Sequence, residues 1–157
     1  MKFVFFGTPE FATIVLDKLV KSGYKPQAVF RNPKESIEIL VSRLKNLKPD
    51  LAIIAAYGKI LPKEVLEIPK HGFINIHGSI LPKYRGPSPI QAAILNGDEK
   101  TGITIMKLDE KMDHGPILAN GVLHIVNNDT YEYLSKKLAE FGAELLIKIL
   151  PNYISGK

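Results

Sequence analysis

The stretch KFVFFGTPEF, residues 2–11, decides the fold class that this sequence predicts. Its apolar run at residues 2–6 is typical of a buried parallel strand, and Gly7 ends that run. Thr8 is expected to cap a helix and Pro9 to occupy its first position, because the fixed φ of proline suits that position. A strand that leads directly into a helix is the repeating unit of α/β proteins.

The same alternation continues along the chain. The sequence predicts further strands at residues 27–30, 51–56 and 73–76, and helices at 37–47, 62–66, 88–95 and 130–150. Two later stretches, 103–108 and 117–125, alternate apolar with polar or small residues and are candidates for antiparallel strands at a sheet edge. We therefore expect an α/β fold with an open, mostly parallel twisted sheet and helices on both faces. No repeat or linker divides the sequence, so residues 1–157 are expected to form a single domain.

Composition narrows the functional classes. The chain has 157 residues, 45% of them hydrophobic, which is too apolar for intrinsic disorder and sufficient for one core. It has no cysteine, which excludes disulfides, thiolate metal sites and a cysteine nucleophile. No apolar run is long enough to span a membrane and no secretory signal is visible, so a cytoplasmic location without membrane association is expected. The net charge of +5 favours an anionic ligand or partner.

Polar residues gather where three predicted segments end. Tyr57-Gly58-Lys59 follows the strand at 51–56, Asn75 and His77 end the strand at 73–76, and Asp113 lies in a later turn. Ligands of open parallel sheets bind beyond the carboxyl ends of the strands. Because Asn75 and His77 are two residues apart, their side chains share one face of the strand. They either hydrogen-bond loop backbone or form part of a site.

An amide, an imidazole and a carboxylate together suit the transfer of an acyl group to an amine. Asn75 would donate to the developing oxyanion, His77 would take or relay the proton, and Asp113 would orient the imidazole. Other chemistries fit the sequence less well. The turn at Gly7 lacks the glycine spacing of dinucleotide and phosphate loops, and no serine-nucleophile motif is present. The four histidines lack the spacing of a zinc site, so no metal is expected.

Several motifs resemble those of the folate-dependent formyltransferases, over nearly the whole chain. The matching stretches are FFGTPEFA (5–12), AAYGKILP (55–62), FINIHGSILPKYRG (73–86), TGITIM (101–106) and MDHGPI (112–117). The Asn-x-His-x-Ser-x-Leu-Pro core followed by Asp-x-Gly is specific to this family. The first two stretches favour the branch of the family that acts on tRNA over the sugar and purine-pathway branches.

The resemblance implies a Rossmann-like formyltransferase fold in which Asn75, His77 and Asp113 are catalytic. It implies 10-formyltetrahydrofolate as the formyl donor, bound by Tyr57, Gly58, Lys59, Ile60, Leu61 and Met112. The acceptor that it favours is the amino group of initiator methionyl-tRNA. Two alternatives stay open: a formyltransferase for an amino sugar nucleotide or another small amine, and a folate-binding module with little catalysis.

Three features depart from the family pattern. Only residues 31–47 separate the strand at 27–30 from Lys48, where the family has a basic tRNA-binding loop and a further edge strand. The strand at 27–30 is therefore expected to lie at the sheet edge. In the branch of the family that acts on tRNA, a C-terminal tRNA-binding domain follows the catalytic domain, and none is expected after residue 157. Weak tRNA affinity is expected as a result, although Lys83 and Arg85 could still meet phosphates. His114, beside Asp113, either adds a titrating group or faces solvent.

Overall fold

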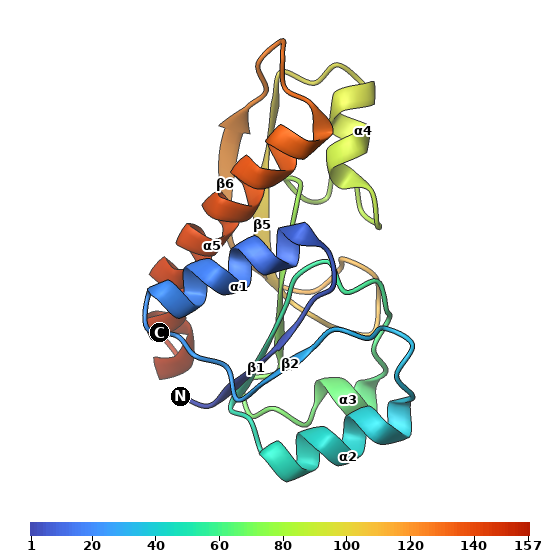
Figure 1. Cartoon of the computed structure of the whole chain (residues 1–157), viewed down its shortest axis with the longest axis vertical. Coiled ribbons are helices and arrows are strands. Elements are labelled where there is room, and N and C mark those ends of the chain that lie inside the picture. The colour runs from blue at the N-terminus through green and yellow to red at the C-terminus, as the bar shows by residue number, and fades with distance from the viewer.

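The computed structural model describes all 157 residues and contains one mixed sheet of six strands (Figure 1). The strands are β1 (Phe3–Phe6), β2 (Ala28–Phe30), β3 (Leu51–Ile54), β4 (Phe73–His77), β5 (Lys100–Lys107) and β6 (Ile117–His124). Their spatial order is β2-β1-β3-β4-β5-β6, with parallel pairing from β2 to β4 and antiparallel pairing of β4 with β5 and of β5 with β6. The α/β prediction and the antiparallel pairing of the last two strands are confirmed, and of these two β6 lies at the sheet edge. As expected, β2 is an edge strand.

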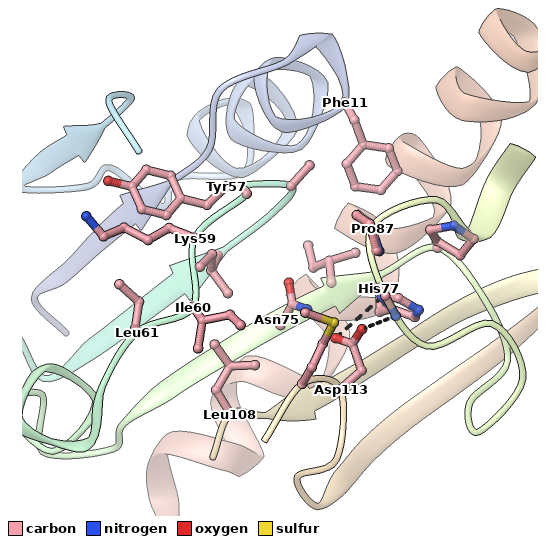
Figure 2. A pocket seen from close by; sticks show the side chains of 18 of the residues that line it. Phe11, Tyr57, Lys59, Ile60, Leu61, Asn75, His77, Pro87, Leu108 and Asp113 are labelled. Atoms are coloured by element: carbon pink, nitrogen blue, oxygen red, sulfur yellow. Dashed lines mark hydrogen bonds and ion pairs between the residues drawn. The ribbon is translucent and has the colours of Figure 1, made fainter. Parts of the chain in front are cut away.

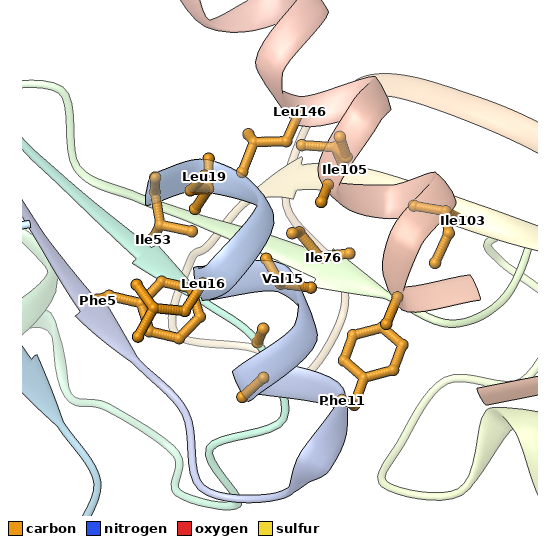
Figure 3. Packing of buried hydrophobic residues seen from close by; sticks show 14 of the residues in the cluster. Phe5, Phe11, Val15, Leu16, Leu19, Ile53, Ile76, Ile103, Ile105 and Leu146 are labelled. Atoms are coloured by element: carbon orange, nitrogen blue, oxygen red, sulfur yellow. The ribbon is translucent and has the colours of Figure 1, made fainter. Parts of the chain in front are cut away.

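Helices cover both faces of the sheet. They are α1 (Glu10–Lys21), α2 (Ile37–Leu47), α3 (Lys63–Leu66), α4 (Pro89–Leu95) and α5 (Tyr131–Ser155). α1 and α5 pack on one face, where Val15, Leu19 and Leu146 meet apolar side chains of the strands (Figure 3). α2 and α3 close a smaller core on the other face. None of these helices combines the length and the apolar character that crossing a bilayer requires.

Two helix boundaries differ from the prediction. Pro9 is the N-cap of α1, not its first helical residue, and the Thr8 hydroxyl donates to the carbonyl of Ala56 at 3.2 Å instead of capping the helix. α5 continues past the predicted end at residue 150 and includes Pro151. The last turn is retained because Leu150 is buried and the Tyr153 hydroxyl donates to the carbonyl of His71 at 2.6 Å.

The alternation of β4 decides where the polar residues of the site lie. Ile74 and Ile76 face the core formed with α1 and α5, while Phe73 faces the core formed with α2 and α3. Asn75 and His77 share the face of Phe73, at the carboxyl end of the strand. The parallel strand β3 ends beside Asn75, and the segment after β3 therefore reaches the same edge of the sheet.

Candidate active site

His77 and Asp113 form a close pair although 35 residues separate them along the chain. The Nδ1 atom of His77 lies 3.7 Å from Oδ1 of Asp113, and the two side chains are only 6% and 10% exposed. On the other side of the imidazole, Nε2 lies 2.9 Å from the carbonyl oxygen of Tyr84. A carbonyl oxygen only accepts, so Nε2 carries the proton and donates to it. Nδ1 is left with its lone pair beside the carboxylate when the ring is neutral.

Asp113 is held by the backbone of the loop that follows β4. Its Oδ2 accepts a hydrogen bond from the amide of Gly86 at 2.7 Å. Asp113 itself has a φ of 49°, a left-handed conformation that aspartate and asparagine tolerate better than most residues. The carboxylate thus connects the loop of residues 78–86 to the turn before β6, with one oxygen on the loop and the other toward His77 (Figure 2).

The loop of residues 78–86 is fixed by hydrogen bonds at two places. Near its start, Thr104 of β5 donates from its hydroxyl to the carbonyl of Ser79 at 2.7 Å and accepts from the amide of Leu81 at 3.0 Å. Near its end, the hydroxyl of Tyr84 donates to Oδ2 of Asp98 at 2.7 Å. The hydrogen bonds from Tyr84 and Lys83 keep the pKa of Asp98 below its ordinary value. The carbonyl of Tyr84 is therefore held in place against His77.

A cleft of about 490 Å³ opens above these groups, and Asn75, His77 and Asp113 line it together. All the residues predicted to bind the donor line the same cleft: Tyr57, Gly58, Lys59, Ile60, Leu61 and Met112. The segment of residues 57–61, which we call the donor loop, lies on one side of the central residues (Figure 2). Leu66 of α3 and Leu108 complete an apolar wall next to it. The structure thus brings every predicted site residue to one place.

Two side chains of the donor loop turn away from the cleft. The hydroxyl of Tyr57 donates to the carbonyl of Asn32 at 2.7 Å, and the ammonium of Lys59 donates to the carbonyl of Glu35. Gly58 has a φ of 73°, and a Cβ added there would meet nothing within 4 Å. The donor loop therefore presents mainly backbone and the side chains of Ile60 and Leu61 to the cleft.

The opposite end of the cleft was not predicted from the sequence. Phe11 and Pro87 lie there, across the central residues from the donor loop (Figure 2), and the cleft lining also includes Pro9, Pro89, Ile90, Gln91, Tyr131 and Ser135. None of these side chains is charged, whereas Asp109, Glu110 and Lys111 line other parts of the cleft. The only signal for this end in the sequence was the Pro-Ser-Pro segment after Gly86, because Phe11 and Tyr131 read as ordinary helical core residues.

Two other predictions about charged residues have clear outcomes. The His114 side chain is 49% exposed, and its Nδ1 lies 2.8 Å from Oδ2 of Asp109, which lowers the pKa of Asp109. His114 lines a neighbouring groove and does not line the cleft. Lys83 pairs with Asp98 at 3.0 Å, so its ammonium is already engaged within the protein. No group of three or more histidine, aspartate or glutamate side chains is placed to hold a metal ion.

Known proteins are similar to this chain in sequence and in fold. Residues 7–150 match the sequence profile of the formyl transferase family, and the chain therefore belongs to that family. Within the family, it is 42% identical to the methionyl-tRNA formyltransferase of Thermodesulfovibrio yellowstonii. That match covers 98% of this chain and 59% of the relative, so the chain spans about three fifths of the relative's length. The alignment runs over 183 positions, more than the 157 residues of this chain, so the relative has additional residues within the matched region.

Solved structures with the same fold include two formyltransferases of small acceptors. Phosphoribosylglycinamide formyltransferase from Bacillus halodurans is 26% identical, with a TM-score of 0.73 over 94% of this chain and 96% of that protein. Glycinamide ribonucleotide transformylase 1 from Symbiobacterium toebii has a TM-score of 0.82 over 98% of this chain and 87% of that protein. At 18% identity, the second likeness concerns the fold alone. Together they confirm the predicted Rossmann-like formyltransferase architecture.

Proposed function

We propose that this chain transfers a formyl group from 10-formyltetrahydrofolate to a primary amine, and that the preferred amine is that of initiator methionyl-tRNA. The observation that carries the proposal is the position of the His77–Asp113 pair, 3.7 Å apart and beside Asn75, between the donor loop and the Phe11 side of one cleft (Figure 2). A formyl group bound on one side and an amine on the other would meet at these side chains.

Each central residue has a role in that reaction. Nδ1 of His77 accepts the proton that the attacking amine loses, since Nε2 already donates to Tyr84. Asp113 stabilises the imidazolium that results, through the oxygen that faces Nδ1. Asn75 donates its amide N–H to the oxyanion that forms when the amine attacks the formyl carbon. His77 then returns the proton to the nitrogen that leaves, so that one N–H bond is lost and one is gained.

The donor end of the cleft fits a folate. The cleft volume of about 490 Å³ lies within the range of about 300–1,000 Å³ that is usual for small-molecule sites. The open space beside Gly58 and the exposed backbone of the donor loop suit the hydrogen-bonding edge of a pterin, while Leu61, Leu66 and Leu108 suit its flat faces. The donor supplies the formyl group and the leaving nitrogen.

The apolar end supports an aminoacyl acceptor over a phosphorylated small amine. Phe11, Ile90 and the prolines offer no positive charge to a phosphate. The nearby start of α1 is also unsuited to an anion, because Pro9 has no N–H and Glu10 places a carboxylate in the first turn. A methionyl side chain would be buried there favourably, and the named relative at 42% identity supports the same acceptor.

The test is a transfer assay with 10-formyltetrahydrofolate labelled in its formyl group and two acceptors, initiator methionyl-tRNA and an amino sugar nucleotide. The proposal expects a formyl amide on methionyl-tRNA and little on the sugar. Formylation of the sugar alone would contradict the proposed acceptor and indicate a formyltransferase for a small amine. Donor binding without transfer to either acceptor would indicate a folate-binding module. His77→Ala is expected to abolish transfer with donor binding retained. His124→Ala, at an exposed histidine on β6, is the matched control and should leave transfer unchanged.

A further inference from the structure

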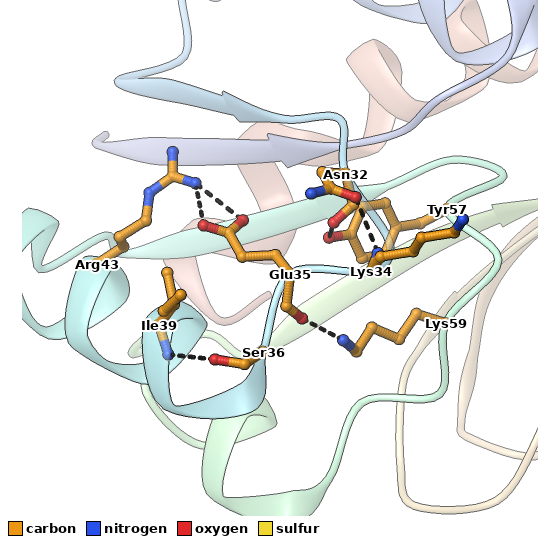
Figure 4. A network of polar contacts seen from close by, with 8 residues as sticks. All are labelled: Asn32, Lys34, Glu35, Ser36, Ile39, Arg43, Tyr57 and Lys59. Carbon is orange, nitrogen blue, oxygen red and sulfur yellow. Dashed lines mark hydrogen bonds and ion pairs between the residues drawn. The ribbon is translucent and has the colours of Figure 1, made fainter.

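The donor loop is attached to the turn between β2 and α2, at residues 32–36 (Figure 4). Two hydrogen bonds make the attachment: the Tyr57 hydroxyl donates to the carbonyl of Asn32 at 2.7 Å, and the Lys59 ammonium donates to the carbonyl of Glu35. Both acceptors are backbone groups. These two carbonyls therefore join the donor loop to the turn.

The turn at residues 32–36 has a well-defined conformation. The side-chain oxygen of Asn32 accepts a hydrogen bond from the amide of Lys34 at 3.0 Å. The backbone carbonyl of Asn32 also accepts one from the amide of Glu35 at 3.2 Å. Ser36 then caps α2 by accepting from the amide of Ile39 at 3.3 Å. These contacts are local, and nothing in them connects the turn to the rest of the protein.

An ion pair makes that connection. NH1 of Arg43, on α2, donates to both carboxylate oxygens of Glu35, at 2.7 and 2.9 Å. The Arg43 guanidinium also lies 4.1 Å above the ring of Phe30, the last residue of β2. The Glu35 side chain is 14% exposed and that of Arg43 is 42% exposed, so the ion pair is partly buried and is screened less than a fully exposed pair. Glu35 is thus fastened to both the helix and the strand that flank the turn.

Tyr57 completes the connection on the side of the donor loop. Its ring is 2% exposed and packs edge-on against Phe6, with ring centroids 5.1 Å apart. Burial, and next the negative charge of Glu35, raise the pKa of the Tyr57 phenol. The hydroxyl consequently stays protonated at neutral pH and keeps its donor for the Asn32 carbonyl.

We propose that Glu35 and Arg43 are positioning residues for the donor: their ion pair holds the turn at residues 32–36, and that turn holds the donor loop in its binding conformation through Tyr57 and Lys59. The inference rests on the proposed function for the identity of the ligand, but the mechanical part concerns this chain alone. Neither Glu35 nor Arg43 lines the cleft, so neither is assigned a contact with substrate.

The expected effect is on donor affinity and not on the chemical step. Loss of one partly buried ion pair or hydrogen bond in a positioning contact is expected to weaken donor binding by about 3- to 10-fold. His77 and Asp113 are held by a different loop, so kcat should stay within about twofold when the donor is saturating. A general loss of folded protein would instead lower the active fraction and leave the KM for the donor unchanged.

The experiment compares Glu35→Gln, Tyr57→Phe and the double variant with the wild-type chain. Tyr57→Phe keeps the ring against Phe6 and removes only the hydroxyl. The first readout is the backbone order parameter of the amides of residues 57–61 without ligand, from ¹⁵N NMR relaxation, and the second is KM and kcat for 10-formyltetrahydrofolate. Glu144→Gln, which breaks an exposed ion pair with Lys18 on the other face, is the matched control.

The proposal expects lower order parameters in the donor loop and a raised KM in both single variants, with a double variant that is less than additive because both act through one turn. Unchanged order parameters at residues 57–61 would overturn it, as would a KM equal to that of the wild type in a chain that binds the donor. If the wild type binds no folate, the proposed function and the donor part of this inference fail together. The NMR data still decide whether Glu35 holds the loop.

Discussion

The replacement of Asp113 by asparagine changes the proposed catalytic pair with little change of shape. Asparagine tolerates the same left-handed backbone conformation. Its side-chain oxygen can still accept a hydrogen bond from the amide of Gly86, which lies 2.7 Å from the carboxylate oxygen in the native protein. The NH₂ group then faces Nδ1 of His77, where the carboxylate oxygen lies 3.7 Å away in the native protein. A small rotation lets that NH₂ donate to the lone pair that the mechanism needs for the proton of the amine.

The expected loss of kcat follows from the interactions that the substitution removes. Asp113→Asn removes the stabilisation of the imidazolium and occupies its proton-accepting atom, so the general-base contribution of about 10²- to 10⁴-fold should disappear from kcat. The bond to Gly86 changes from charge-assisted to neutral, which should lower the free energy of unfolding by no more than about 1–2 kcal/mol. The donor loop is untouched, so donor affinity should stay near that of the wild type.

Two measurements check this prediction on the same preparation. Single-turnover formyl transfer with saturating donor gives the rate of the chemical step, and urea unfolding followed by circular dichroism gives the stability. A variant that is folded and still transfers within tenfold of the wild-type rate would refute the assignment of Asp113 to the proton transfer at His77. A variant that transfers at the normal rate but needs a much higher donor concentration to reach saturation would place Asp113 in donor binding instead.

Three further predictions concern the scaffold. Gly102→Ala puts a Cβ 2.0 Å from the carbonyl oxygen of Gly121 on the paired strand, and it should destabilise the protein by at least about 1–3 kcal/mol in urea unfolding; a neutral result would contradict the tight β5–β6 pairing. Leu138→Ala empties a fully buried position on α5 and should lower the unfolding free energy by about 2–5 kcal/mol, whereas a loss well below that would show that the core between α5 and the sheet is loosely packed. The pKa of Asp98 is lowered by hydrogen bonds from Tyr84 and Lys83, so the stability that these bonds give is complete at neutral pH and is lost as the pH falls through that lowered value. The stability difference between the wild type and Asp98→Asn should therefore shrink in acid, and a difference independent of pH would contradict this.

The sequence predicted the order of strands and helices because each apolar run is interrupted by a clear break such as Gly7 or Asn96-Gly97. It did not predict the length of α5, since a proline at position 151 ordinarily ends a helix. Tertiary contacts decided that boundary: Leu150 is buried, and the Tyr153 hydroxyl is bound to the carbonyl of His71, far away in the sequence.

The site was predicted as a set of residues but not as a geometry. Alternation on β4 placed Asn75 and His77 on one face, whereas the approach of Asp113 to His77 was expected only from the chemistry of the three side chains and from the family resemblance, since no spacing in the sequence requires it. Side-chain directions in the donor loop could not be predicted, because they depend on the positive φ angles of Ala56 and Gly58. In the folded chain the phenol of Tyr57, between these two residues, donates to the carbonyl of Asn32.

In the proposed reaction, the donor and the amine meet at Asn75 and His77 from opposite ends of one cleft. A crystal structure of the chain with 5-formyltetrahydrofolate, a folate that carries its formyl group on N5 instead of N10, would show where the donor binds. We expect the pterin to lie against the backbone of residues 57–61, with N10 within about 3–4 Å of the side chains of Asn75 or His77, and the end lined by Phe11 to stay open. A pterin seated at the Phe11 end, or outside the cleft altogether, would contradict it.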